Sequence, residues 1–255
     1  ESLFDLKQVL QDNFGYDSFL PGQEAILKDI FSRKHVVAIM PTGGGKSLLY
    51  QLPASVANGL VVVISPLISL MKDQVEALRA RGMRAAHVNS SISAAEKRDA
   101  ADALRNHELD LLYIAPERMR DRRFIQTLKE ANVTVLAVDE AHCISHWGHD
   151  FRPDYMNISS LRKDLGDPVT IAVTATATRK VREDIARNLE LEDWADHVEG
   201  FDRENLFFKV TEIVTRDEKF RLIAEGIQQM KGPSIIYAAT RKNVELIANM
   251  LRLEK

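Results

Sequence analysis

Short apolar segments alternate with amphipathic stretches along most of the chain. The apolar segments are rich in Val, Ile and Leu, which is typical of strands buried on both faces of a sheet. The stretches between them repeat apolar residues at helical spacing. This pattern predicts strands at residues 35–40, 60–64, 84–88, 109–114, 133–138 and 169–173. Strands that alternate with helices favour an α/β fold, with a parallel sheet flanked by helices.

The pattern changes on both sides of this core. Two helices are predicted before the first strand, at 3–14 and 23–31, and residues 190–205 are interpreted as a connection. A new cycle then follows, with a strand at 206–213, a helix at 216–230, a strand at 234–238 and a helix at 240–253. The printed sequence stops before this cycle could complete a second sheet. We therefore expect one domain over residues 1–200 and an incomplete second domain over 201–255.

Composition narrows the functional classes. The 255 residues are 45% hydrophobic and 28% charged, as in a soluble globular protein. A net charge of -3 argues against coating nucleic acid through bulk positive charge, so any DNA contact must be local. The single cysteine, Cys143, can form neither an internal disulfide nor a zinc site of several thiolates. With no signal-like or membrane-spanning run, we expect a protein that is not secreted and has no membrane partner.

A glycine-rich loop follows the first predicted strand and precedes an apolar helix: Pro41, Thr42, Gly43, Gly44, Gly45, Lys46 and Ser47. Successive glycines let the backbone wrap around phosphate and direct amide groups at its oxygens. Lys46 would contact the β and γ phosphates of a nucleotide, and the Ser47 hydroxyl would hold Mg²⁺. The strict pattern begins with Gly where this chain has Met40, and a glycine-rich turn that binds nothing is the alternative. The strand–loop–helix context favours a phosphate site.

Acidic residues follow the strand predicted at 133–138, in the sequence Asp139, Glu140, Ala141 and His142. Ligands of open parallel sheets bind at the carboxyl ends of strands, so we expect this pair to face the glycine-rich loop from a neighbouring strand. Asp139 would hold Mg²⁺, and Glu140 would orient and deprotonate the attacking water. Adjacent carboxylates can also simply complement a helix N-terminus, and His142 could be a cap or a packing residue.

The glycine-rich loop, the acidic motif and a third segment together resemble motifs I, II and III of superfamily 2 helicases. These segments are Pro41–Ser47, Asp139–His142 and Thr174–Thr176. Further segments narrow the resemblance to the RecQ family: Phe14–Glu24, Ser65–Gln74, Tyr113–Arg118, Cys143–Pro153 and Phe201–Arg203. The resemblance spans nearly the whole chain. It implies a RecA-like domain and the start of a second, with ATP and Mg²⁺ as cofactors. It also implies movement 3′ to 5′ on single-stranded and partly duplex DNA, in repair or recombination.

The same resemblance assigns roles near the nucleotide. It implies that Tyr16 stacks on adenine and that Gln23 recognises the base by paired hydrogen bonds. Leu20 stands where the family usually has Arg, which removes a cationic group from the base site. Before Arg241, whose counterpart contacts nucleic acid, this chain has Ala-Ala-Thr in place of the family's Cys-Asn-Ser.

The loop after the acidic motif carries candidate DNA contacts. Trp147 and Phe151 can stack on unpaired bases, each for roughly 1–3 kcal/mol, and Arg152 can engage a phosphate. Because the loop starts at His142, DNA binding could reposition the catalytic carboxylates. The alternative is that both aromatic rings pack beneath the loop.

Polar residues near the predicted strand ends could line a track for the DNA backbone: Ser65, Ser69, Lys72, Asn89 and Ser90. Any one of them could instead be an N-cap or a solvated surface residue. Thr174 and Thr176 would connect the nucleotide site to that track, although threonines in turns also serve as caps.

The family's arginine finger comes from a later motif that this sequence does not reach, and such a finger contributes about 10³ to 10⁵ in rate. We therefore expect the chain to bind Mg-ATP but to hydrolyse it poorly. Two other functions stay open: an RNA-dependent ATPase of the same superfamily, and a nucleotide-dependent DNA-binding module that never unwinds. The expected location is the cytoplasm, near a bacterial nucleoid, or the nucleus.

Overall fold

The computed structural model describes residues 5–148, 150–200, 206–230 and 232–253. The chain divides into two compact units, Glu1–Asp202 and Arg203–Lys255. His149 and the whole of the 201–203 segment, which take part in the family resemblance, lie outside the described residues.

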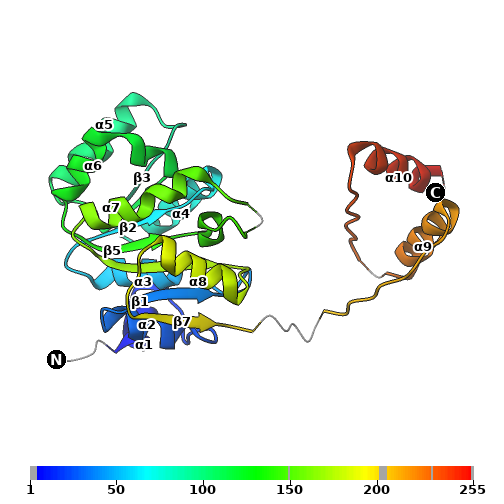
Figure 1. Cartoon of the computed structure of the whole chain (residues 1–255), viewed down its shortest axis with the longest axis horizontal. Coiled ribbons are helices and arrows are strands. Elements are labelled where there is room, and N and C mark those ends of the chain that lie inside the picture. Colours follow the sequence, from blue (N-terminus) through cyan, green and yellow to red (C-terminus); the bar gives the residue numbers. More distant parts are fainter. Residues whose placement is uncertain (1–4, 149, 201–205, 231, 254–255) are drawn as a thin grey trace. The chain divides into compact units, whose positions relative to one another are not determined.

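The first unit is built on one parallel sheet of seven strands (Figure 1). Their order across the sheet is β3-β4-β2-β5-β6-β1-β7. In chain order the strands are β1 His35–Ile39, β2 Leu60–Ile64, β3 Ala85–Val88, β4 Leu111–Ile114, β5 Val133–Val138, β6 Val169–Thr174 and β7 Trp194–Val198. All six pairings are parallel, so the carboxyl ends of the strands lie along one edge of the sheet.

Helices cover both faces of this sheet, which explains why its central strands are mostly apolar and largely buried. One buried cluster joins alternate strand residues to α1 Leu6–Phe14, α2 Gln23–Phe31, α3 Leu48–Val56 and α4 Ile68–Ala80. The other cluster joins the remaining strand residues to α5 Ala94–Arg105, α6 Arg122–Lys129, α7 Ile158–Asp164 and α8 Arg179–Asn188. Three short 3-10 helices complete the unit: η1 Pro116–Arg120, η2 Ala141–Ile144 and η3 Pro153–Asn157.

Local sequence signals account for several helix boundaries. The Asp5 side chain accepts hydrogen bonds from the first turn of α1, and Gly15 ends that helix in the left-handed region at φ 72°. Ser93 and Glu96 form a reciprocal capping box on α5. Thr178 caps α8 by accepting a hydrogen bond from the Val181 amide. These caps satisfy amides that would otherwise have no partner within the helix.

The predicted parallel sheet is confirmed, and β2 and β5 have the predicted bounds. The other four predicted strands are found with ends shifted by one or two residues. The interpretation of 190–205 as a connection is wrong in part, because it contains β7, which pairs with β1. This strand includes Asp196 and His197 and has one neighbour only, so it lacks the apolar pattern of the central strands.

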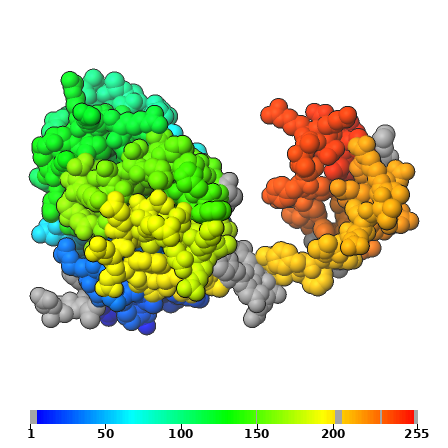
Figure 2. Space-filling model, viewed as in Figure 1, coloured from blue at the N-terminus to red at the C-terminus, as the bar shows by residue number. Residues whose placement is uncertain are grey.

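The second unit contains α9 Arg216–Gln229 and α10 Arg241–Leu253, close to the predicted helices. A cavity of about 580 Å³ between them is lined by Phe220, Ala224 and Met250. The atoms of this unit are coloured from orange to red in the space-filling view (Figure 2). The strands predicted at 206–213 and 234–238 are not formed in the described residues, where Phe207 and Tyr237 are largely exposed. A strand is stable only when a neighbour satisfies its backbone groups, and these two segments do not pair.

Among the described residues, no helix has both the length and the apolar character that crossing a membrane requires.

Candidate nucleotide and nucleic-acid site

The glycine-rich loop connects β1 to α3 at the carboxyl edge of the sheet. Gly43 and Gly45 adopt φ values of 83° and 71°, which side chains other than glycine rarely tolerate. At Gly45 a side chain would also collide with the amide of Gln23. Space is open at Gly43, where an added Cβ would meet nothing within 4 Å. The loop therefore has the backbone shape and the access that a phosphate cradle requires.

Lys46 is folded back onto its own loop. Its ammonium donates hydrogen bonds to the carbonyl oxygens of Met40, at 3.2 Å, and Pro41, at 3.4 Å. Ser47 precedes the first turn of α3, and its carbonyl accepts the amide of Gln51 at 3.0 Å. A phosphate could replace both carbonyls as partners of the ammonium, since a charged acceptor makes the stronger hydrogen bond.

The acidic motif leaves the sheet at the end of β5. Asp139 accepts hydrogen bonds from the Ser65 hydroxyl at 3.1 Å and from the Glu140 amide at 3.0 Å. Its carbonyl oxygen accepts a hydrogen bond from the buried Tyr155 hydroxyl at 3.0 Å. Glu140 itself has φ 48°, a left-handed conformation that is strained for a residue with a side chain. The Asp139 carboxylate is thus held in position by two hydrogen bonds.

Burial raises the pKa of Asp139, and the neighbouring charge of Glu140 raises it further. The hydrogen bond from Ser65 and the positive charge of Lys46 act in the opposite direction. Lys46 lies on the loop that follows β1, and Asp139 lies at the end of β5, so both are at the carboxyl edge of the same sheet. The pKa of Asp139 is raised on balance, so its charged form is unfavourable unless a cation lies nearby.

The sequence had suggested that the glycine-rich loop and the acidic motif follow neighbouring strands. This prediction is wrong. β6 lies between β5 and β1, and its last residue, Thr174, contacts both sides. The Thr174 carbonyl accepts the Met40 amide at 3.1 Å, while its hydroxyl lies 2.7 Å from His142 Nδ1. The same hydroxyl accepts the Thr176 amide at 3.4 Å. Thr174 therefore joins the strand that carries the loop to the acidic motif.

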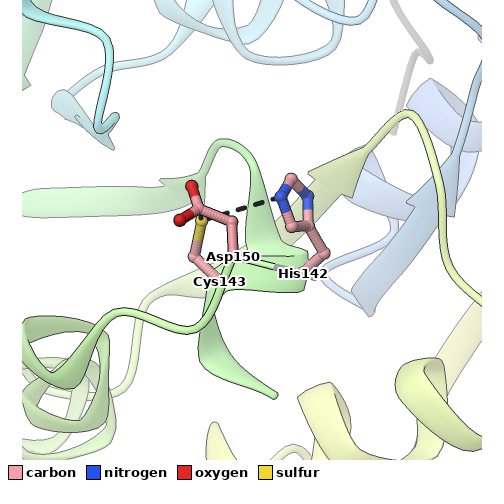
Figure 3. Close-up of side chains that lie close together, drawn as sticks. All are labelled: His142, Cys143 and Asp150. Carbon is pink, nitrogen blue, oxygen red and sulfur yellow. Dashed lines mark hydrogen bonds between the residues drawn. The ribbon is translucent and has the colours of Figure 1, made fainter. Parts of the chain in front are cut away.

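His142 is buried between the acidic motif and the loop that follows it. Its Nδ1 also lies 3.3 Å from Glu140 Oε2. Cys143 Sγ lies 3.8 Å from His142 Nε2 and donates to Asp150 Oδ2 at 3.8 Å, so thiol, imidazole and carboxylate face one another (Figure 3). Asp150 is paired with Arg152, and burial raises the pKa of Cys143 to about 12. The thiol is therefore neutral at physiological pH and acts as a packing and hydrogen-bonding group.

The predicted adenine site opens beside the glycine-rich loop. A cavity of about 440 Å³ is lined by Tyr16, Leu20, Gln23, Gly43, Gly45 and Ser47, among others. Tyr16 is half exposed, as a ring that stacks on a base would need to be. Gln23 is only 2% exposed, and its amide group donates to the carbonyl oxygens of Gly44 and Gly45 while accepting the Leu20 amide. Its side chain is fully used inside the protein in this structure.

The loop that follows the acidic motif, residues 142–153, is called the post-acidic loop. Its aromatic residues differ in their surroundings. Trp147 is 65% exposed, and the Lys180 ammonium lies 3.1 Å from the centre of its ring. Phe151 stacks on His146, with ring centres 3.7 Å apart. The Arg152 guanidinium donates to Asp150 at 2.9 and 3.1 Å. Trp147 does not pack beneath the loop, so its ring is available for stacking.

The predicted backbone track divides into exposed and buried residues. Ser69, Lys72 and Ser90 are exposed. Ser65 is 4% exposed and bonded to Asp139, and Asn89 is 1% exposed and accepts hydrogen bonds from the Ser91 amide and hydroxyl. These two side chains serve the protein's own hydrogen-bond network in this structure.

Arg241 is exposed at the start of α10 in the second unit, where it lines a cavity of about 420 Å³ with Thr240 and Val244. Its DNA contact stays a prediction.

Sequence reasoning overlooked three residues that shape this site. Tyr155 fixes the acidic motif, Asp184 accepts a hydrogen bond from Ser145 at 2.6 Å, and Lys180 covers Trp147. Each acts through a contact with a distant part of the chain. No local pattern in the sequence indicates such contacts.

Residues 20–185 match the model of the DEAD/DEAH box helicase family. The chain belongs to this family. The match begins at the predicted adenine site and extends into α8, so it covers the glycine-rich loop, the acidic motif and the Thr174 segment.

Relatives within the family are similar over almost the whole chain. A probable ATP-dependent DNA helicase RecS from Bacillus subtilis is 40% identical over 97% of this chain and 50% of the relative. The ATP-dependent DNA helicase RecQ of the same organism is 46% identical over 96% of this chain and 42% of the relative. The chain spans half or less of the length of these relatives.

Solved helicase structures share the fold. The structure of the DUF1998 helicase MrfA bound to DNA and AMPPNP has a TM-score of 0.71 and 19% sequence identity, and the match covers 99% of this chain and 38% of that one. At this identity the likeness concerns the fold alone, and it identifies the sheet as a RecA-like helicase fold.

Proposed function

We propose that this chain is the ATP-binding motor part of a DNA helicase that couples ATP hydrolysis to 3′ to 5′ movement on single-stranded DNA and to duplex unwinding. Repair or recombination is the proposed setting, by analogy with RecQ. The observation that carries the proposal is the shared site of Lys46 and Asp139. Thr174 of β6 joins the strand that carries the Lys46 loop to the acidic motif, where the partly buried Asp139 carboxylate is held by Ser65 and lies beside Glu140. Phosphoryl transfer requires this pairing of a phosphate-binding cation with an acidic pair.

Mg²⁺ fits the oxygen donors of this site. The Ser47 hydroxyl and the Asp139 carboxylate are hard ligands of the kind that Mg²⁺ prefers. The raised pKa of Asp139 supports the assignment, because a cation would stabilise its charged form. Bound there, Mg²⁺ would neutralise charge on the β and γ phosphates.

Glu140 and His142 would perform the chemistry beside the phosphates. Glu140 would orient the attacking water and accept its proton. His142 lies 3.3 Å from Glu140 and 2.7 Å from Thr174, so it would hold the Glu140 carboxylate in a fixed position relative to the end of β6. The post-acidic loop starts at His142, so DNA that moves the loop would also move the Glu140 side chain.

We further propose that the second unit is the start of a second RecA-like domain. The open arrangement of α9, α10 and the two exposed apolar segments supports this, because those segments have the composition of strands without strand partners.

The alternative of an RNA-dependent ATPase shares the phosphate machinery and differs in the nucleic acid that stimulates it. The post-acidic loop favours DNA, through its resemblance to RecQ. A nucleotide-dependent binding module is the second alternative, and it would change DNA affinity with ATP but show no turnover.

The deciding experiment measures ATP binding and ATPase rate for this chain alone, with single-stranded DNA, and with RNA of matched sequence. We expect ATP binding, a low rate, and greater stimulation by DNA than by RNA. Lys46→Ala should lower the residual rate by about 10²-fold or more, because it removes a charge from the phosphate site. Equal stimulation by RNA would contradict the DNA assignment, and robust DNA-stimulated turnover would contradict the expected weakness of this chain.

A further inference from the structure

Trp147 is held from one side by a lysine of another element. Lys180 lies in the first turn of α8, and its Nζ is 3.1 Å from the centre of the Trp147 ring. An ammonium over an indole face is attracted by the negative charge of the ring face. Because the ring is still 65% exposed, the lysine fixes its position without burying it.

The base of the loop that carries this ring is anchored to the same helix. Ser145 donates to Asp184 of α8 at 2.6 Å and accepts the Trp147 amide at 3.1 Å. Gly148 approaches the carbonyl of His142 so closely that any side chain there would collide with it. With the backbone fixed on both sides of Trp147, the freedom that remains is that of the ring, and Lys180 limits it.

An open cavity of about 520 Å³ lies beside the ring, between the loop and the segment that leads into α8. Its lining includes Trp147, Gly148, Thr176, Thr178 and Arg182. Arg182 is paired with Asp196, so its charge is balanced within the protein. The cavity volume is within the range of about 300–1,000 Å³ found for small-molecule sites.

The chemistry of this cavity suits one unpaired nucleobase. It offers an aromatic face for stacking and threonines beside it for hydrogen bonds, and the exposed residues Arg179 and Lys180 lie in the same first turn of α8 as the lining residues Val181 and Arg182. Proteins that bind single strands use this combination of a stacking ring and nearby positive charge. Thr176 also connects the cavity to the catalytic site, since its amide bonds the same Thr174 hydroxyl that contacts His142.

We propose that Lys180 is the positioning residue that holds the Trp147 ring for stacking on one nucleobase of single-stranded DNA, and that the Thr176–Arg182 segment forms the second wall around that base. The inference rests on the proposed DNA-dependent function. It adds a wall from α8 and a residue, Lys180, that lies outside the post-acidic loop.

The test uses the full chain with Trp194→Phe, which leaves Trp147 as the single tryptophan of the two in the sequence. Acrylamide quenching of its fluorescence is measured with and without oligodeoxythymidylate, and DNA affinity is measured by fluorescence anisotropy. Three further variants are compared in this background. Lys180→Met removes the cation but keeps the apolar stem, Lys180→Arg keeps the cation, and Arg179→Gln removes an adjacent charge that is paired with Glu183.

We expect Lys180→Met to raise the quenching constant of free Trp147 by about twofold and to weaken DNA binding by about two- to fivefold, the loss of one exposed cation–π contact. Arg179→Gln should weaken binding only through charge and leave the quenching of free Trp147 as it is. Lys180→Arg should behave like the parent. DNA should protect Trp147 in the parent, and this protection should be smaller in Lys180→Met.

Three results would overturn the inference in distinguishable ways. If the parent does not bind the oligonucleotide, the proposed function fails and the subsite fails with it. If the parent binds DNA without protecting Trp147, the subsite is wrong while DNA binding stands. If Lys180→Met and Arg179→Gln give the same quenching, Lys180 contributes charge alone and has no positioning role.

Discussion

The side chains around the glycine-rich loop and the aromatic ring of the post-acidic loop are held in different ways. Lys46, Asp139 and Gln23 each make hydrogen bonds within the protein. Trp147, by contrast, is exposed and held by one lysine. Groups of the first kind keep their positions without ligand, whereas the ring can respond to one. The difference indicates that the glycine-rich loop and the Asp139 carboxylate are the fixed part and that the Trp147 ring is the adjustable part.

The largest expected effect tests the fixed side. Glu140→Gln removes the proposed base but keeps the shape of the side chain, so ATPase turnover should fall by about 10²- to 10⁴-fold. Binding of a non-hydrolysable ATP analogue should persist, because the glycine-rich loop is untouched. Steady-state ATPase assays and analogue titration measure the two quantities. If analogue binding is lost together with turnover, Glu140 supports the loop and is not primarily a base.

The next effect tests the adjustable side. Trp147→Ala removes a stacking surface worth roughly 1–3 kcal/mol, so DNA affinity should fall by about five- to 150-fold. The DNA-stimulated part of ATP turnover should fall with it. Phe151→Ala is the matched comparison, because that ring is already stacked on His146 and should contribute less. A larger loss for Phe151→Ala would reverse the assignment of the stacking residue.

These two sides were also predictable from sequence to different degrees. The glycine-rich loop and the acidic motif are local patterns, and each follows an apolar strand, so their place at one sheet edge could be derived. The interposed β6 could not, because strand order depends on pairing between distant segments. β7 escaped notice because Asp196 and His197 interrupt its apolar pattern. The contacts of Tyr155 and Lys180 depend on the folded chain, and no residue spacing indicates them.

A smaller effect concerns the link between the adenine site and the phosphate loop. Gln23→Ala removes two hydrogen bonds to the Gly44 and Gly45 carbonyls, each worth about 0.5–1.5 kcal/mol, and should lower both thermal stability and ATP affinity. Gln23→Glu retains the acceptor for the Leu20 amide but loses the donor to the loop. If Gln23 also reads adenine, ATP binding should weaken more than GTP binding in both variants. Equal losses for the two nucleotides would limit Gln23 to supporting the loop.

The smallest expected effect is on the pH dependence of protein stability, which depends on the pKa of Asp139. Its pKa is raised in the folded protein, chiefly by burial and then by the charge of Glu140, so the folded state binds a proton more tightly than the unfolded state does. Stability at this group is therefore highest below its unfolded pKa and decreases as the pH rises through the folded value. Asp139→Asn should remove that decrease.

Thermal melts of Asp139→Asn and the parent, without nucleotide or metal, should show the variant gaining relative stability between acidic and neutral pH. ATP turnover by the variant should be lost. Ser65→Ala is the control, because it removes a hydrogen bond that lowers the pKa of Asp139 and should make the decrease in stability steeper. If Asp139→Asn is destabilised equally at every pH, its carboxylate is held mainly by hydrogen bonds. The charged form of Asp139 would then not need a nearby cation, contrary to what the burial of this group implies.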